Sequence, residues 1–205
     1  QKEDGLYNSM ILLCPGREDL QSYSKKYLVP IVEYFPLDDL LNRWLDLRVI
    51  LGTYERGKEI NVMNLNGMPL SGAICFESFF GSYTRQFAAA GAEHLFILTN
   101  DNWLNNSNGI DQHAHMVMIR AAEMGIGVTQ VANSGITLSA DFTGKELLRS
   151  NIDEVKILHL ETDFAGRNTV YRMGGDYFII LGCLYVLIVL GVFFSRKDKF
   201  ISRNP

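Results

Sequence analysis

The chain has 205 residues, of which 47% are hydrophobic and 20% are charged, so we expect a domain with a well-filled core. The net charge of −4 gives no reason to expect a nucleic-acid partner, because nucleic-acid-binding domains usually present a clustered basic face. The three cysteines form no CxxC pair and the four histidines form no HExxH motif, so the sequence predicts no disulfide framework, no metal and no cofactor.

The first third of the chain predicts short strands and little helix. Residues 6–13 are rich in apolar and β-compatible types and predict a strand. Two prolines argue against a long helix over 23–36, whereas leucines at helical spacing predict a short amphipathic helix at 37–48. Asn66-Gly67 predicts a turn between two short strands.

The middle of the chain alternates between apolar runs and helical patterns. We predict strands at 72–77, 94–101, 128–135, 136–142 and 155–161, and helices at 78–92 and about 110–125. This order implies right-handed crossovers and an α/β fold in which helices cover a substantial sheet. The strands that are apolar throughout are typical of burial on both faces.

Near the end, residues 177–194 (YFIILGCLYVLIVLGVFF) carry no formal charge. A helix of that length spans roughly 27 Å, close to the hydrocarbon thickness of a bilayer, so we predict one transmembrane helix. A buried core helix is the alternative, but such a helix normally shows a polar stripe. The basic residues within 195–205 favour a cytoplasmic tail, which places the domain, residues 1–170, on the extracytoplasmic face.

Two residues are candidates for chemistry from their types and positions. Cys75 follows an apolar strand and precedes a predicted helix, where backbone N–H groups favour a thiolate and can also receive an oxyanion. Taken alone, a single cysteine in an apolar strand is more often a buried structural residue. Lys25 would stabilise a thiolate and an oxyanion if it lay nearby, although a solvated loop lysine is the ordinary alternative.

Five segments resemble, in order, the motifs of the nitrilase (carbon–nitrogen hydrolase) superfamily. They are YSKKYLVPIVEYFP at 23–36, AICFES at 73–78, TNDNWLNNS at 99–107, QHAHMVMIRAAEMG at 112–125 and ANSGITLSADFTGK at 132–145. Within that superfamily, the terminal apolar segment and the basic tail make this chain similar to the apolipoprotein N-acyltransferases. The resemblance implies part of a nitrilase-like α-β-β-α sandwich, followed by one transmembrane helix.

The resemblance also implies roles for individual residues. Cys75 would be the nucleophile, and Lys25 would stabilise the oxyanion with help from the backbone N–H of Phe76. Glu33 would hold Lys25 by an ion pair or hydrogen bond, and Glu77 would organise the site. Trp103 would shape a lipid-facing entrance to the site. Without the motifs, the two glutamates would be ordinary surface carboxylates, and the tryptophan could equally be an apolar loop anchor.

The sequence departs from the family pattern at a few positions. Tyr27 stands where the family usually has histidine, Ile31-Val32 where it has phenylalanine-glycine, and Phe76 where it commonly has tyrosine. The family's first glutamate, its general base, has no match in the opening QKEDGLYN. We therefore expect this base to belong to an amino-terminal portion that the sequence does not contain.

The implied function is acyl transfer in lipoprotein maturation at the bacterial inner membrane, on its periplasmic face. A phospholipid would donate a fatty acyl group to Cys75 as a thioester, and the terminal amine of a diacylglyceryl-cysteine apolipoprotein would accept it. Three alternatives remain open at this point. They are a membrane-tethered amidohydrolase that passes the acyl group to water, an anchored scaffold without activity, and a fragment that is inactive because it lacks the base.

Overall fold

The computed structural model describes residues 5–16, 19–34, 54–104, 108–161 and 166–201, with side chains as far as Phe193. The helix predicted at 37–48 lies outside these residues, and so do parts of the basic tail. Six strands form one mixed sheet in the order β3-β4-β5-β6-β7-β8. Their bounds are β3 (Met63–Leu65), β4 (Met68–Ile74), β5 (His94–Thr99), β6 (Gly127–Ala132), β7 (Leu138–Ala140) and β8 (Glu146–Arg149).

The three central strands, β4, β5 and β6, run parallel, and the outer pairs are antiparallel. The parallel arrangement follows from the helices between these strands, because each helix returns the chain to the same edge of the sheet. Ile74 at the end of β4 lies opposite Leu98, and Thr99 at the end of β5 lies opposite Ala132. The residues that follow these three strands therefore gather at one edge of the sheet, where sites in such folds commonly form.

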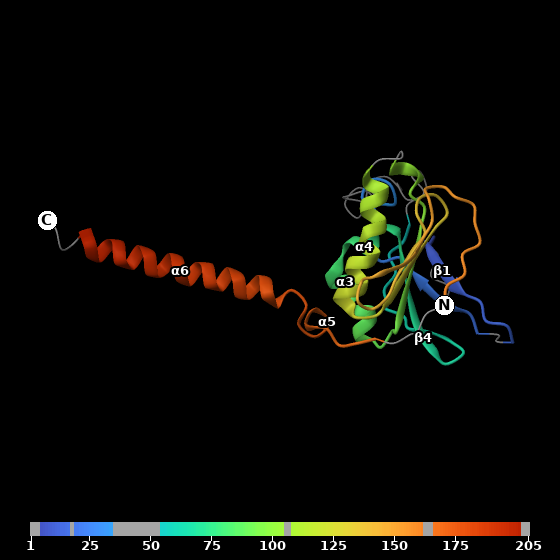
Figure 1. The fold of residues 1–205 in the computed structure, drawn as a ribbon, viewed down its shortest axis with the longest axis horizontal. Helices are drawn as coiled ribbons and strands as arrows, with labels where there is room; N and C mark the ends of the chain where they lie inside the picture. The colour runs from blue at the N-terminus through green and yellow to red at the C-terminus, as the bar shows by residue number, and fades with distance from the viewer. Residues whose placement is uncertain (1–4, 17–18, 35–53, 105–107, 162–165, 202–205) are drawn as a thin grey trace.

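Two helices, α3 (Gly81–Ala89) and α4 (Asn108–Met124), cover one face of the six-stranded sheet (Figure 1). The apolar strands are buried against them, as the fully buried Phe87, Val117 and Leu95 show. Burial of such side chains supplies most of the favourable free energy of a fold of this kind. The predicted α/β class, with helices over a sheet, is confirmed.

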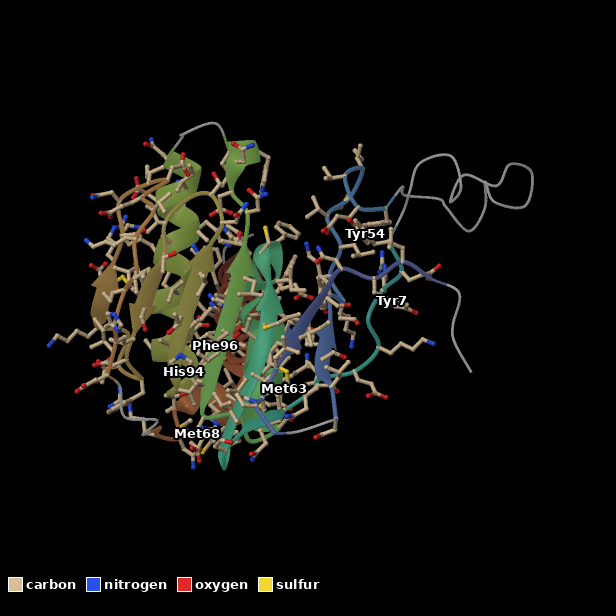
Figure 2. The ribbon with its side chains drawn as sticks, turned by 90° about the vertical axis from the view of Figure 1, so that its right-hand side faces the viewer. Tyr7, Tyr54, Met63, Met68, His94 and Phe96 are labelled. Atoms are coloured by element: carbon tan, nitrogen blue, oxygen red, sulfur yellow. The ribbon has the colours of Figure 1, made fainter. Side chains whose placement is uncertain are left out.

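Strands β1 (Ser9–Leu12) and β2 (Gln21–Ser24) pair antiparallel and lie against the opposite face of β4. A Cβ atom on Gly72 would come within 2.0 Å of the end of the Met10 side chain, so the Met10 side chain of β1 packs directly over Gly72 of β4. Figure 2 shows Tyr7 and Tyr54 on the far side of this small sheet from the six-stranded one. The described chain thus forms three layers: helices, a mixed sheet and a two-stranded sheet.

The turn predicted at Asn66-Gly67 is confirmed, and a second turn joins the next antiparallel pair of strands. Asn66 and Gly67 join β3 to β4 with φ angles of 53° and 93°, the left-handed pair that tight hairpins require. Thr143-Gly144 joins β7 to β8, where Gly144 has φ 84° and Thr143 N donates a hydrogen bond to Asp141 Oδ1. These turns keep consecutive strands adjacent in the sheet.

The strand predicted at 155–161 is wrong. Residues 146–149 form β8 instead and pair with β7, whereas Val155 is fully exposed and Ile157 nearly so. An apolar, β-branched segment becomes a strand only where it pairs with a sheet, and in the described sheet β8 holds the place beside β7 while residues 155–161 pair with no strand.

A short helix, α5 (Val170–Gly174), leads to α6 (Tyr177–Ile201), which extends away from the sheet (Figure 1). The helix predicted from residue 177 is therefore present, and its large apolar side chains from Tyr177 to Phe193 are exposed. Within the described part of the chain, no helix combines the length and the apolar character needed to cross a membrane. The predicted transmembrane span at 177–194 is thus not supported.

Candidate active site

Cys75 lies where the chain turns sharply out of the sheet. Strand β4 ends at Ile74, so the prediction that 75–77 continue the strand is wrong, and residues Cys75–Phe79 form a 3₁₀ helix, η1. Cys75 has φ 51°, a left-handed conformation that is unusual for a residue with a side chain. It is half-buried and unbridged. A thiol at such a turn stands clear of the strand and is open to a ligand.

Lys25 follows β2 and is almost completely buried against Glu33. Its Nζ atom lies 2.8 Å from Glu33 Oε1 and 2.7 Å from Oε2, with side-chain exposures of 2% for Lys25 and 12% for Glu33. The amide of Val29 donates to Glu33 Oε2 and the side-chain amide of Asn8 donates to Oε1. A buried ammonium requires such a partner, because an unpaired charge away from water is strongly disfavoured.

These two groups open onto one cavity of about 410 Å³. Cys75, Lys25 and Glu33 line it together with apolar side chains and a few polar ones: Asn8, Ser9, Val29, Val32, Ile74, Leu98, Thr99, Asn100 and Trp103. Trp103 lies in a short 3₁₀ helix, η2 (Asn102–Leu104), and is 58% exposed, so it stands at the opening. The structure therefore brings Cys75, Lys25, Glu33 and Trp103, all of them predicted site residues, around a common space.

Glu77 takes a different position from the other predicted site residues. It is fully buried, so its carboxylate cannot touch a ligand in the cavity. Its Oε1 atom accepts hydrogen bonds from the amides of Lys26 and Tyr27 and from the Tyr23 hydroxyl, at 2.8, 3.0 and 2.7 Å, and its Oε2 accepts from Ile74 N at 2.8 Å. Burial raises the pKa of Glu77, against the effect of these hydrogen bonds. Glu77 thus ties the loop after β2 to the end of β4.

Tyr23 extends this buried network into the helix layer. Its hydroxyl lies 2.7 Å from that of Tyr83 on α3, and its ring meets Phe87 edge to face. Burial is the main cause that raises the pKa of Tyr23, and the nearby Glu77 carboxylate is the second cause. The phenol therefore stays neutral and able to donate a hydrogen bond. The backbone of the lysine loop is therefore fixed by polar contacts inside the core.

A second polar network lies behind Cys75. His113 on α4 places Nδ1 2.8 Å from Asp101 Oδ1, and Nε2 2.9 Å from Ser78 Oγ and 3.3 Å from the carbonyl oxygen of Cys75. Thr99 also donates to Asp101 Oδ1, at 2.7 Å. These groups join the ends of β4 and β5 to α4.

Sequence reasoning assigned no role to several residues of these networks, among them His113, Asp101, Asn8 and Tyr23. His113 falls in the apolar stripe of α4 with Ile110, Ala114 and Val117, and a polar residue in such a stripe was an available signal. Asp101, which follows a buried strand, was another. Asn8 and Tyr23 gave no local signal, because their partners are 25 and 54 residues away in the sequence.

Phe76 lies in η1, and its ring contacts those of Phe79 and Phe80 at 5.8 and 5.0 Å. The ring therefore belongs to an aromatic cluster, and only the backbone N–H remains as the group expected to face an oxyanion. Among the described residues, no group of three or more histidines, cysteines, aspartates or glutamates could hold a metal ion. The chemistry available at the cavity is that of a thiol, an ammonium, a carboxylate and backbone amides.

Comparison with curated proteins finds apolipoprotein N-acyltransferases among the related sequences. Apolipoprotein N-acyltransferase 1 of Treponema denticola is 34% identical over 206 residues, covering 97% of this chain and 38% of that protein. Apolipoprotein N-acyltransferase of Thermotoga maritima is 34% identical over 198 residues, covering 92% and 37%. The Haemophilus ducreyi protein of the same name is 29% identical over 205 residues, covering 97% and 40%. The chain thus spans about two fifths of the length of these relatives.

Solved structures share the fold at low identity. Saccharomyces cerevisiae Nit3, a member of branch 10 of the nitrilase superfamily, matches with a TM-score of 0.55 and 15% identity, over 72% of this chain and 50% of that one. Glutamine-dependent NAD+ synthetase from Acinetobacter baumannii also matches with a TM-score of 0.55 and 15% identity, over 76% and 28%. The predicted nitrilase-like α/β fold is confirmed. A family model described as carbon-nitrogen hydrolase matches residues 1–167, most of the sequence, and the chain belongs to that family.

Proposed function

We propose that this chain carries the nucleophile and the oxyanion-stabilising groups of an apolipoprotein N-acyltransferase. The reaction moves a fatty acyl group from a membrane phospholipid to the terminal amine of a diacylglyceryl-cysteine apolipoprotein. Relatives that bear this name support the proposal. The observation that carries it is the cavity, in which a thiol and a buried lysine–glutamate pair share a space with apolar walls.

The apolar walls suit an acyl chain. Val29, Val32, Ile74, Leu98 and Trp103 line the same cavity as Cys75. Burial of a fatty acyl chain contributes about 0.8 kcal/mol for each methylene group, so even a partly buried chain would be held firmly. The ester carbonyl of that chain would then lie near the thiol.

In the first half of the reaction, a general base takes the proton of the Cys75 thiol. The thiolate attacks the ester carbonyl, a C–S bond forms, and the C–O bond to the glycerol breaks. The lysophospholipid leaves with a proton on its new hydroxyl group. Lys25, held in place by Glu33, stabilises the oxyanion together with the backbone N–H of Phe76.

In the second half, the amine of the apolipoprotein attacks the thioester. A C–N bond forms, the C–S bond breaks, and the proton lost by the amine restores the Cys75 thiol. Division of the transfer into two steps through a covalent intermediate is typical of thiolate nucleophiles and predicts ping-pong kinetics. The same oxyanion-stabilising groups serve both halves, because both pass through a tetrahedral intermediate.

The exposed apolar surface of α6 supports a location at a lipid surface. Large apolar side chains from Tyr177 to Phe193 are exposed along this helix, far more than a soluble domain usually leaves uncovered. We propose that lipid covers this helix at the inner membrane and that the cavity works on the periplasmic face. Both substrates carry acyl chains and would reach the cavity from that surface.

The test is acyl transfer by the purified full-length protein in detergent, because this chain spans about two fifths of the length of its relatives and holds none of the residues predicted as general base. Labelled phosphatidylethanolamine is the donor and a synthetic diacylglyceryl lipopeptide is the acceptor. The wild-type protein is expected to acylate the peptide and to carry a fatty acyl adduct on Cys75 that mass spectrometry detects. Cys75→Ser should lower transfer by about 10³-fold or more. Cys183→Ser, which changes an exposed cysteine on α6, is the matched control and should keep full activity.

Two outcomes would contradict the proposal. Release of labelled fatty acid without acylation of the peptide would mean that water is the acceptor and that the protein is a hydrolase. Undiminished transfer by Cys75→Ser would mean that the thiol is not the nucleophile.

A further inference from the structure

The backbone of Cys75 is supported from behind by one imidazole. The His113 ring is 1% exposed, and it contacts Asp101 at the end of β5, Ser78 in η1 and the carbonyl oxygen of Cys75 itself. Since the ring is buried, it acts on the nucleophile rather than on a ligand. Asp101 and Ser78 are also fully buried, so water does not compete for these contacts.

The chemistry of the partners determines what the ring can do. A carboxylate only accepts hydrogen bonds, so Nδ1 carries a hydrogen and donates it to Asp101. The Ser78 hydroxyl can donate or accept a hydrogen bond, so it bonds to Nε2 whether or not that atom carries a hydrogen. The carbonyl oxygen of Cys75 can only accept, so it is bound when Nε2 carries a hydrogen. In every case the imidazole links β5 to the turn that holds the thiol.

That turn requires support. Cys75 has φ 51°, and a non-glycine residue keeps such a conformation only where its surroundings impose it. If the turn relaxed, the Cα–Cβ bond would swing and the thiol would leave its place in the cavity. The groups around Cys75 thus determine the reactivity of the thiol as well as the backbone conformation of the turn.

The imidazole is itself held firmly. The ring of Phe79 stacks on it at 5.1 Å and 21°, Thr99 donates to the same carboxylate oxygen, and Asp101 N donates to Ser134 O at 2.8 Å. A side chain with partners on both ring nitrogens and a stacked face has little rotational freedom. Such preorganisation is what a reacting atom needs, because a small misplacement lowers the rate strongly.

We infer that His113, oriented by Asp101, is a positioning residue that fixes the left-handed turn at Cys75 and so directs the thiol into the cavity beside Lys25. The inference rests on the proposed function, since it assigns the role through the nucleophile. It adds a dependence on α4, which contributes none of the residues that line the cavity.

The test compares His113→Asn with His113→Gln. The amide nitrogen of asparagine lies near the place of Nδ1 and keeps the bond to Asp101, but it cannot reach Ser78 or Cys75. The amide of glutamine reaches the place of Nε2 and keeps those contacts. We expect His113→Asn to lower the rate of Cys75 alkylation by iodoacetamide, and kcat for acyl transfer, each by about tenfold or more, with KM within about twofold. His113→Gln should recover most of both rates.

Alkylation is followed by mass spectrometry of the Cys75 peptide, in a Cys14→Ser, Cys183→Ser background. His115→Asn is the matched control, because this neighbouring histidine on α4 is exposed and its Nδ1 atom bonds to the backbone oxygen of Asp111 in the same helix. Wild-type rates in His113→Asn would overturn the inference. Equal losses of the alkylation rate and kcat in His113→Asn and His113→Gln, in proportion to their lower unfolding temperatures, would also overturn it. This pattern would mean that His113 has a structural role alone. If the wild-type protein transfers no acyl group, the proposed function fails, and the alkylation rates alone decide the role of His113.

Discussion

The two walls of the cavity are held by different means. The Cys75 wall consists of β4 and η1, and β4 is paired with β3 on one side and β5 on the other. The Lys25 wall consists of β2 and the loop to Glu33, and β2 pairs only with β1 in the described sheets. The first wall therefore belongs to the six-stranded sheet, whereas the second belongs to the two-stranded sheet that packs against it.

The difference extends to the loops. Behind the Cys75 wall, buried side chains bond to one another, as in the network of His113 and Asp101, in which Asp101 Oδ1 is bonded and Oδ2 has no hydrogen-bond partner among the described residues. On the Lys25 wall, Ile31 and Val32 are 76% and 79% exposed, and the lysine is held by the single carboxylate of Glu33. The nucleophile is thus fixed by the sheet and the lysine by an ion pair, so substitutions should affect the two walls in different ways.

The largest expected effect is on the ion pair of the Lys25 wall. Glu33→Gln leaves a buried ammonium without its counter-charge, so we expect the free energy of unfolding to fall by about 3 kcal/mol and acyl transfer to be lost. The double variant Lys25→Met, Glu33→Gln should regain most of the stability, because no charge remains buried, but none of the activity. Urea unfolding and the transfer assay measure both. A Glu33→Gln protein as stable as the wild type would show that this wall does not depend on the pair.

Glu77 joins the two walls, and its substitution tests whether they move independently. In Glu77→Gln, the amide nitrogen replaces an oxygen that accepts from a backbone or phenol donor, so at least one buried donor loses its partner. We expect a loss of about 2–3 kcal/mol in urea unfolding and a lower rate of transfer. Glu93→Gln, at an exposed position, is the control and should change stability by less than about 0.5 kcal/mol. Equal stabilities would mean that Glu77 does not link the walls.

Much of the Cys75 wall was predictable from the sequence. The apolar runs of β4, β5 and β6, and the helices between them, carry their signal locally, because burial on both faces needs apolar residues at nearly every position. The end of β4 was not predictable in this way. The strand stops at Ile74 because the carboxylate of Glu77 turns back to accept from Ile74 N, a contact that competes with the strand.

The Lys25 wall was predictable only through its motif. Lys25 and Glu33 are eight residues apart, and nothing in local propensity requires their side chains to meet. Asn8 and Tyr23 join the site through long-range contacts, which no pattern of hydrophobic residues specifies. The false strand at 155–161 has the same origin, since an edge of a sheet is assigned by competition between segments and not by either segment alone.

The buried sheet beside the Cys75 wall can be probed by pH through His94, the first residue of β5, which Figure 2 shows near one end of the sheet. Burial lowers the pKa of His94 from 6.5 to about 4. In the unfolded chain His94 takes up a proton below pH 6.5, whereas in the folded chain it takes up that proton only near pH 4. The contribution to stability is therefore complete above pH 6.5 and is lost as the pH falls towards 4.

From this group alone, we expect the free energy of unfolding to fall by about 2 kcal/mol between pH 7 and pH 5. His94→Leu removes the titration, so the difference between its pH dependence and that of the wild type, in urea unfolding, isolates the effect. Parallel curves for the two proteins would mean that the ring is protonated in the folded state, and that this end of the sheet is not dry.

The smallest effect concerns Ile31 on the Lys25 wall. Ile31 has φ 71°, a conformation that β-branched residues strongly disfavour, whereas asparagine adopts it readily. Since the side chain is largely exposed, Ile31→Asn should raise the free energy of unfolding by about 1 kcal/mol in urea. Val32→Asn, at an exposed neighbour without a positive φ, should change it by less than about 0.5 kcal/mol. A gain at position 31 alone means that the Lys25 wall holds strain; equal changes mean that its loop is relaxed.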